Sequence, residues 1–178
     1  DPNEFINSIL QNVCTNDSAA ESFSSICALI GLVESSCQQI EFYSQRIVEY
    51  CVDRAKLGSL SVTQGILRLI YELIKTQQES MTDCASELCN FLFQLYEAHQ
   101  DETIIQQSLD AICFIFYSLN LERSFVIDYV PKLIQSYQEA SQSLKPNFMQ
   151  CLSGSIITCQ EDSAAFAELL LPIIIEGS

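Results

Sequence analysis

Few residues in this chain could take part in catalysis. The single histidine, His99, follows a predicted helix and precedes Asp101. A Ser-His-Asp or Cys-His site needs a histidine as its base, so any such site would have to use His99. A histidine at the C-terminal end of a helix complements the helix dipole. The sequence therefore favours a capping or surface role for His99 over a catalytic one.

The carboxylates occur mostly singly, and two adjacent pairs lie where helices are expected to begin. These pairs are Asp101–Glu102 and Glu161–Asp162. Acidic side chains at a helix start cap free backbone N–H groups and complement the dipole, which explains both pairs without acid–base chemistry. The sequence also contains no phosphate-binding glycine loop, no GxSxG elbow and no HExxH motif. It therefore predicts neither an enzyme nor a bound cofactor.

The chain has nine cysteines, but their spacing forms no framework for a metal or for disulfides. No CxxC pair occurs, and the nearest approach to a zinc site, Cys84 and Cys89 with His99, has poor ligand spacing. Four of the cysteines fall among apolar residues of predicted helices, where a reduced thiol behaves as a small hydrophobic side chain. These are Cys27, Cys89, Cys113 and Cys151. The pattern predicts no metal and a reducing compartment, the cytoplasm or the nucleus.

The net charge of the 178-residue chain is −15, from 8 Lys and Arg against 23 Asp and Glu. A negative field of this size repels phosphate backbones and anionic membranes, and it attracts basic proteins. The alternative explanation is that acidity keeps a chain with 48% hydrophobic residues in solution. No apolar run approaches the roughly 20 residues that a membrane span requires. We therefore expect protein partners, without nucleic acid or membrane insertion.

Apolar residues recur at helical spacing along nearly the whole chain, and strand-like alternation is absent. Only 5 glycines and 4 prolines occur, too few for the many tight turns of a β domain. The predicted helices span 3–14, 17–35, 37–56, 60–77, 80–98, 102–119, 122–140, 144–159 and 162–176. Their expected starts are Asp17, Ser59 or Ser61, Thr82 or Asp83, and Asp101, with Gly58 as a left-handed stop. The short connections require successive helices to be antiparallel.

These helices divide into two alternating types. First-type helices include 43–55, 87–98, 129–140 and 169–177, and aligning Arg46, Asn90, Pro131 and Pro172 gives spacings of 44, 41 and 41 residues. Second-type helices lie between them, at 23–35, 63–75, 108–119 and 149–159. Their small residues, expected to permit close helix contacts, are Gly31, Gly65, Ala111 and Gly154. Such uniformity favours a stack of helix pairs over an irregular all-α bundle, the alternative fold.

Two first-type segments, VPKLIQSY and LLPIIIEG, place a proline inside a helix. They resemble the first helix of HEAT repeats, in which a proline often precedes a more apolar second helix. The resemblance implies an all-α, right-handed α-solenoid of about four HEAT-like helix pairs, with eight to nine antiparallel helices. A single segment would fill 1–178. Its repeats would span 1–35, 37–77, 80–119 and 122–160, followed by a terminal helix at 162–176.

The last helix is almost wholly apolar, with the sequence LLLPIII at 169–175. A terminal repeat in a helical stack needs a polar outer face. We therefore expect 169–175 to be covered by further repeats, by a partner or by another copy. The chain also begins with Asp-Pro rather than Met, which fits a segment of a longer array.

One stripe of the second-type helices combines charged and aromatic side chains. In HEAT families these helices usually line the concave surface, where aromatic residues beside acids can hold a basic, partly apolar segment. The candidate partner-binding residues are Arg68, Glu72, Asp110, Phe114 and Tyr117. In the alternative, Phe114 packs into the following repeat and the other residues form a solvated face.

Acidic, cysteine-rich HEAT arrays resemble segments of the karyopherin-β nuclear transport receptors. That resemblance implies binding of basic cargo, Ran or nucleoporins. The competing interpretation is a HEAT scaffold or regulatory subunit of a complex unrelated to nuclear transport. Both interpretations predict a protein that binds other proteins and catalyses no reaction.

Overall fold

The computed structural model describes residues 2–11, 18–35, 37–119, 121–159, 164 and 167–176, and these contain helices but no strand. In chain order the helices are α1 (Pro2–Gln11), α2 (Ala19–Glu34), the 3₁₀ helix η2 (Gln38–Tyr43), α3 (Ser44–Ala55), α4 (Leu60–Thr76), α5 (Gln78–Met81), α6 (Ala85–Ala98), α7 (Glu102–Ser118), α8 (Arg123–Glu139), α9 (Lys145–Cys159) and α10 (Ala167–Glu176). The all-α class predicted from the sequence is confirmed. None of these helices has both the length and the hydropathy needed to cross a bilayer.

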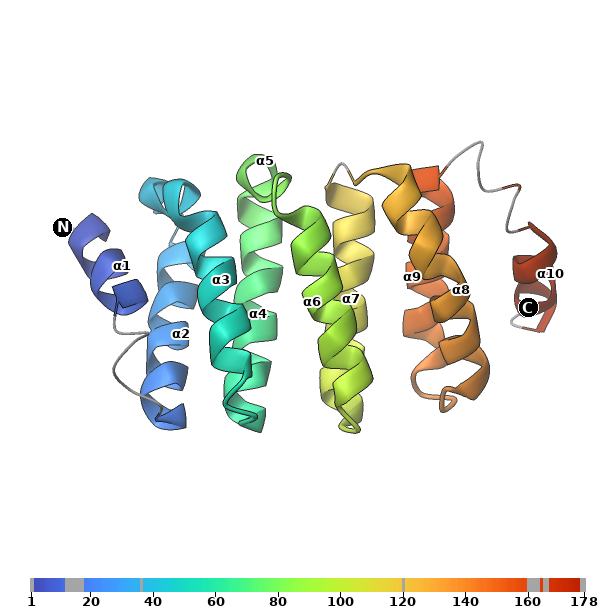
Figure 1. Ribbon diagram of the computed structural model, residues 1–178, viewed down its shortest axis with the longest axis horizontal. Helices are drawn as coiled ribbons and strands as arrows, with labels where there is room; N and C mark the ends of the chain where they lie inside the picture. Colours follow the sequence, from blue (N-terminus) through green and yellow to red (C-terminus); the bar gives the residue numbers. More distant parts are fainter. Residues whose placement is uncertain are drawn as a thin grey trace.

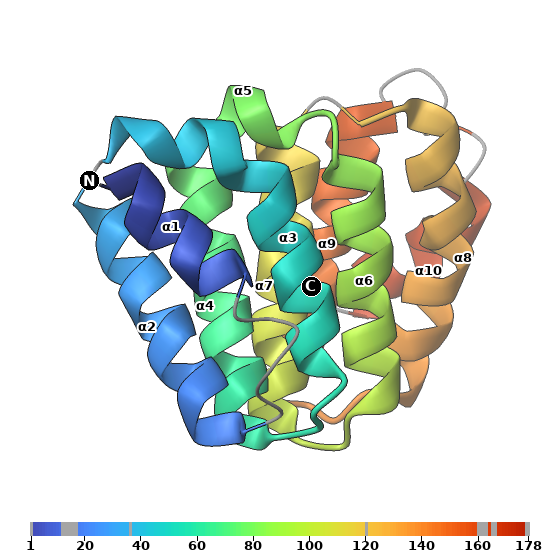
Figure 2. The ribbon, with the colours of Figure 1, turned by 60° about the vertical axis from the view of Figure 1, so that its left-hand side comes forward.

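The long helices form two layers. We call α1, α3, α6 and α8 the first layer and α2, α4, α7 and α9 the second layer, with α10 at the far end (Figures 1 and 2). Successive long helices alternate in direction (Figure 1), because connections of a few residues leave no length for a return crossing. Fully buried side chains come from both layers, among them Ile47 of α3, Ile70 of α4, Leu92 of α6 and Ile112 of α7.

Two predicted helices are each divided in the structure. Residues 37–56 form η2 and then α3, and residues 80–98 fall on α5, a turn, and α6. At both places the backbone bonds tighten to a three-residue separation: the Ile40 N–H donates to the Cys37 carbonyl at 3.0 Å, and the Ala85 N–H to the Thr82 carbonyl at 3.2 Å. The short helix α5 also places Met81 in the core with no exposed surface. The single helices predicted over these ranges were therefore wrong in detail.

The predicted helix ends are confirmed in part. The Asp101 carboxylate caps α7 by accepting hydrogen bonds from the Thr103 and Ile104 N–H groups at 3.0 and 3.1 Å. Gly58 has a φ of 63°, the left-handed conformation expected after α3. Ser59 precedes α4, but its side chain makes no capping bond. Residue 17 and the pair 161–162 lie outside the described residues.

The start expected at Thr82 or Asp83 lies elsewhere. The residue that precedes α6 is Cys84, and its side chain caps no helix N–H. Because the Cys84 thiol instead donates to the Met81 carbonyl at 3.4 Å, it helps to close the turn between α5 and α6.

Two of the three second-type glycines lie at close helix contacts. A Cβ on Gly65 would lie 3.1 Å from Ile26 of α2, and one on Gly154 would lie 3.2 Å from Phe116 of α7. The same prediction for Gly31 was wrong, because a Cβ there would meet nothing within 4 Å.

The prolines and the last helix have the expected placement. Pro131 lies inside α8 and Pro172 inside α10. Leu170 and Ile173 of α10 are buried, whereas Leu171 and Ile175 are 54% and 68% exposed. That a further repeat or a partner covers this helix remains a prediction.

Side-chain hydrogen bonds between the helices join residues at a narrow range of separations. Arg46 of α3 donates to Asn7 of α1, 39 positions earlier. Arg68 of α4 bonds Glu34 of α2, 34 positions earlier, and the Thr158 hydroxyl of α9 donates to the Phe116 carbonyl, 42 positions earlier. Each bond therefore connects a helix to the preceding helix of its own layer.

Candidate protein-binding groove

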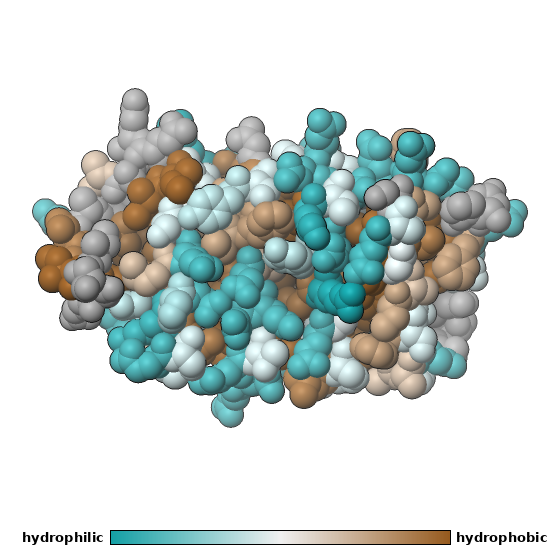
Figure 3. Space-filling view, turned by 180° about the vertical axis from the view of Figure 1, so that it is seen from behind, coloured by the Kyte–Doolittle hydropathy of each residue, from teal (hydrophilic) through white to brown (hydrophobic). Residues whose placement is uncertain are grey.

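An open groove of about 660 Å³ runs across α4, α7 and α9 of the second layer. Its lining residues are Leu67, Arg68, Tyr71, Gln106, Gln107, Asp110, Cys113, Phe114, Asn147 and Gln150. Figure 3 shows this side of the molecule, with hydrophilic residues across its middle and hydrophobic residues toward the end where α10 lies. The groove is therefore a mixed surface rather than a purely apolar one.

Helical periodicity places these side chains. On α7, Gln106, Asp110 and Phe114 are spaced four residues apart, so they form one stripe. On α4, Arg68 and Tyr71 are three residues apart, and on α9 the same spacing aligns Asn147 with Gln150. Because α4, α7 and α9 pack side by side, the three stripes together form the groove.

Two aromatic rings stack where α4 meets α7. The centroids of Tyr71 and Phe114 are 5.2 Å apart and their planes differ by 29°. Tyr71 remains 39% exposed, whereas Phe114 is half-buried. This ring partner lies on the preceding second-layer helix, and packing of Phe114 into the following repeat stays a prediction.

Asp110 is held by a neighbouring helix. The Asn147 side-chain amide donates to Asp110 Oδ1 at 2.7 Å, which joins α9 to α7. One turn further along α7, Cys113 lines the groove beside Cys151 of α9. Side-chain hydrogen bonding with Cys151 lowers the pKa of Cys113, against desolvation, which raises it. The α7–α9 side of the groove therefore contains both a fixed carboxylate and a thiol of lowered pKa.

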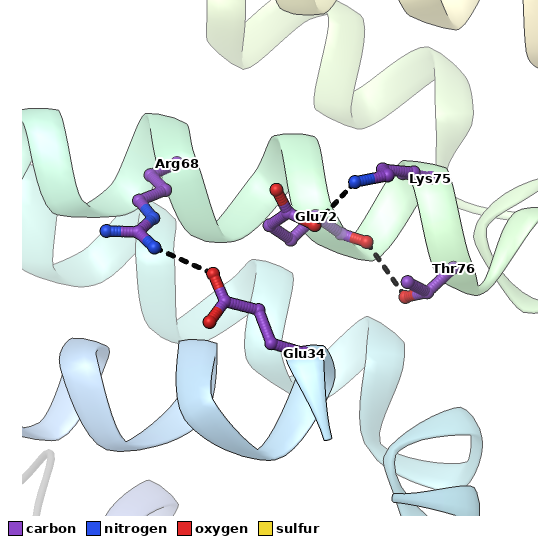
Figure 4. A network of polar contacts seen from close by, with 5 residues as sticks. All are labelled: Glu34, Arg68, Glu72, Lys75 and Thr76. Atoms are coloured by element: carbon purple, nitrogen blue, oxygen red, sulfur yellow. Dashed lines mark hydrogen bonds and ion pairs between the residues drawn. The ribbon is translucent and has the colours of Figure 1, made fainter. Parts of the chain in front are cut away.

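The positive charge of Arg68 is balanced on its own side of the groove. The Arg68 guanidinium donates to Glu34 Oε1 at 2.7 Å, and the Lys75 ammonium lies 3.4 Å from Glu72 Oε2 (Figure 4). The hydrogen bond that Arg68 donates to Glu34, and next the negative charge of Glu34, raise the pKa of Arg68. Both cations of this helix face are therefore ion-paired.

The structure brings three of the five candidate residues together. Arg68, Asp110 and Phe114 line the groove. The Glu72 side chain is only 17% exposed; it pairs with Lys75, while its backbone carbonyl accepts a hydrogen bond from the Thr76 hydroxyl at 2.8 Å (Figure 4).

Tyr117, the fifth candidate, is 49% exposed and is not among the residues that line the groove. Its ring lies against α9, where a Cβ on Gly154 would be 3.3 Å from Tyr117 Cε2. Tyr117 therefore belongs to a helix contact beside the groove rather than to the groove itself.

Sequence analysis missed Tyr71, Gln107, Asn147 and Gln150 as groove residues. Tyr71 lies three residues after Arg68, so the helical period places it on the same side of α4, beside the polar stripe that contains Glu72. Asn147 had no comparable signal, because its role depends on where α9 packs against α7.

The candidate catalytic and metal residues do not form a cluster. His99 follows the last residue of α6, where its N–H donates to the Leu95 carbonyl at 3.2 Å, as expected for a helix end. Cys84 and Cys89 are buried, and within the described residues no three His, Cys, Asp or Glu side chains gather around a possible metal position. Of the four cysteines predicted to pack as small hydrophobic side chains, Cys27 is exposed, so that prediction was wrong there. The remaining three, Cys89, Cys113 and Cys151, are buried.

No protein-family model matches the chain, and no curated protein matches it in sequence.

Proposed function

We propose that the chain is a segment of a right-handed α-solenoid built from HEAT-type helix pairs. In such a stack each repeat contacts only its neighbours, so contacts between repeats recur at about one period. Bonds between residues 39 and 42 positions apart lie close to the period of the aligned segments and support this architecture, while the Arg68–Glu34 bond spans 34 positions. In an irregular bundle the helix contacts would lie at more varied separations.

The function of this segment is to bind another protein. The observation that carries the proposal is the groove, in which three consecutive second-layer helices present a stacked aromatic pair beside hydrogen-bonding side chains. Aromatic anchors surrounded by polar positions are typical of protein interfaces.

The partner class follows from charge and from the resemblance to HEAT arrays. With a net charge of −15, the chain attracts basic segments, and the rings offer an apolar surface to the same guest. Together with the resemblance to karyopherin-β receptors, this favours a nuclear transport segment that binds basic cargo, Ran or nucleoporins in the cytoplasm and nucleus.

A second candidate function is a scaffold or regulatory subunit of a stable complex. The exposed apolar side chains of α10, Leu171 and Ile175, favour it. Apolar surface of this kind is typical of permanent interfaces, which are less sensitive to salt than charge-steered ones.

Affinity capture from a cell extract, with low-salt and then high-salt washes, distinguishes the two. The immobilised chain is compared with Asp110→Asn, which removes the groove carboxylate, and with Glu87→Gln, which removes an exposed charge on α6 of the other layer. Captured proteins are identified by mass spectrometry.

Nuclear cargo, Ran or nucleoporins retained by the parent chain and by Glu87→Gln, and lost from Asp110→Asn, would support the transport function. A salt-resistant stoichiometric complex that Asp110→Asn does not affect would favour the scaffold function instead. Recovery of a substrate turned over by the chain would overturn both.

A further inference from the structure

The groove contains acceptor atoms with unused capacity. A carboxylate can accept about four hydrogen bonds, and Asp110 receives one from Asn147. Gln107 also lines the groove, and its Oε1 is buried without a hydrogen-bond partner within the described residues. A buried acceptor left unpaired is unfavourable, and it adds to the shortage of donors in the groove. The groove therefore fits a guest rich in N–H donors.

The charge balance of the groove favours a cationic guest. Arg68 and Asp110 are the two charged residues that line it. Arg68 is neutralised by Glu34 at 2.7 Å, whereas Asp110 forms no ion pair among the described residues and bonds a neutral amide. One net negative charge is therefore left for a guest to neutralise.

The aromatic pair adds a flat surface. Tyr71 is 39% exposed while its ring stacks on Phe114, and Phe114 follows Asp110 by one turn of α7. Phe114 and the Asp110 carboxylate thus lie next to each other on one face of α7, with Tyr71 of α4 stacked on Phe114. A planar cation can stack on such a ring and bond such a carboxylate at the same time, whereas an ammonium group has no plane to stack.

We infer that the groove is a subsite for an arginine side chain of a partner protein. The guanidinium stacks on Tyr71 and donates to the Asp110 carboxylate. This inference rests on the proposed protein-binding function and adds the identity of the recognised side chain. Lysine would retain the charge but lose the stacking and the two-pronged hydrogen bonding.

The test is selection of a random peptide library displayed on phage against the folded chain. Enriched peptides are synthesised, each also with arginine replaced by lysine and by citrulline, which is planar but neutral. Affinities are measured for the parent chain, Asp110→Asn, Tyr71→Leu and Tyr71→Phe. Glu87→Gln is the charge-matched control, and circular dichroism verifies that each variant is folded.

We expect the enriched peptides to share an arginine. Asp110→Asn should weaken the binding of these peptides about tenfold or more, and Tyr71→Leu should weaken it about threefold or more. Tyr71→Phe, which keeps the ring, and Glu87→Gln should bind like the parent. Replacement of the arginine by citrulline should lower the affinity more than replacement by lysine, because citrulline removes the positive charge that Asp110 neutralises.

The other outcomes separate this inference from the proposed function. Peptides without arginine that still depend on Asp110 and Tyr71 would overturn the arginine subsite while the protein-binding groove survives. Peptides insensitive to all groove variants, or no enrichment at all, would overturn both.

Discussion

The two helix layers contact their neighbours in different ways. In the second layer the backbones come close, because Gly65 of α4 faces Ile26 of α2 and Gly154 of α9 faces Phe116 of α7. Added Cβ atoms would lie only 3.1 and 3.2 Å from these side chains. The second layer is therefore held by close apolar packing.

The first layer relies on longer side chains. The Tyr129 hydroxyl of α8 donates to Asn90 of α6, and its ring stacks on Phe93 with centroids 4.0 Å apart. Apolar packing at close range is sensitive to the volume of a single methyl group, whereas one hydrogen bond contributes about 0.5–1.5 kcal/mol. We therefore expect most of the stability to depend on the second layer, which also forms the groove.

The largest effect is expected for Ile112→Ala in α7. Ile112 has no exposed surface, so the variant leaves a cavity in the second layer and should lower the free energy of unfolding by about 2–5 kcal/mol. Urea denaturation followed by circular dichroism measures the loss. Ile157→Ala on α9 is the matched control: Ile157 is 57% exposed, and the expected change is within about 0.5 kcal/mol. Equal losses in the two variants would contradict the described core.

Gly154→Val tests the close contact directly. The added side chain meets Phe116 and Tyr117, so overpacking should lower the free energy of unfolding by about 1–3 kcal/mol. Gly31→Ala changes the same residue type in the same layer, but at a position with open space. It should raise the stability by about 0.5–1 kcal/mol, because alanine favours the helix. Both variants are compared by urea denaturation, and changes of the same sign would disprove the proposed role of Gly154.

Tyr129→Phe examines the first layer. It removes the hydroxyl that donates to Asn90 and keeps the stacked ring. The free energy of unfolding should therefore fall by about 0.5–1.5 kcal/mol. Tyr117→Phe, at a residue 49% exposed, should change the stability much less. Thermal unfolding of both variants provides the measurement. A loss for Tyr129→Phe as large as that for Ile112→Ala would remove the distinction between the layers.

The helical class and the order of the helices could be predicted because almost every helix buries one face. In α4, for example, Ile66, Ile70 and Leu73 recur at helical spacing and all three have no exposed surface. The divisions after Tyr43 and Met81 could not be predicted, since neither place carries a glycine or proline. Those breaks arise from a local change in backbone hydrogen bonding, which the side-chain period does not record.

From the sequence, the groove residues could be predicted only as stripes on single helices. Periodicity placed Asp110 and Phe114 on one stripe, and the structure keeps them together. Which stripe of α4 faces them depends on how the helices cross, and that geometry selects Tyr71 over Glu72. Asn147 was missed for the same reason, because its bond to Asp110 bridges two helices.

The effect that is smallest near neutral pH concerns a thiol of the first layer. Burial raises the pKa of Cys51 in α3 from 9.0 to about 12. Between these values the unfolded thiol has lost its proton and the folded one retains it, so the unfolded state is favoured as the pH rises. The free energy of unfolding should therefore fall above pH 9, and Cys51→Ala should reduce that slope in denaturation measured on both sides of pH 9.

Thiol labelling extends the comparison to the groove. The thiolate is the reactive form, and Cys113 lines the groove with a lowered pKa, whereas Cys51 is fully buried with a raised one. Iodoacetamide should therefore modify Cys113 before Cys51 in the folded chain, with peptide mass spectrometry to assign the sites. Exposed Cys27 serves as the internal reference for an accessible thiol. Labelling of Cys51 at the rate of Cys113 would mean that the first layer opens to solvent as readily as the groove, and the contrast between the layers would then fail.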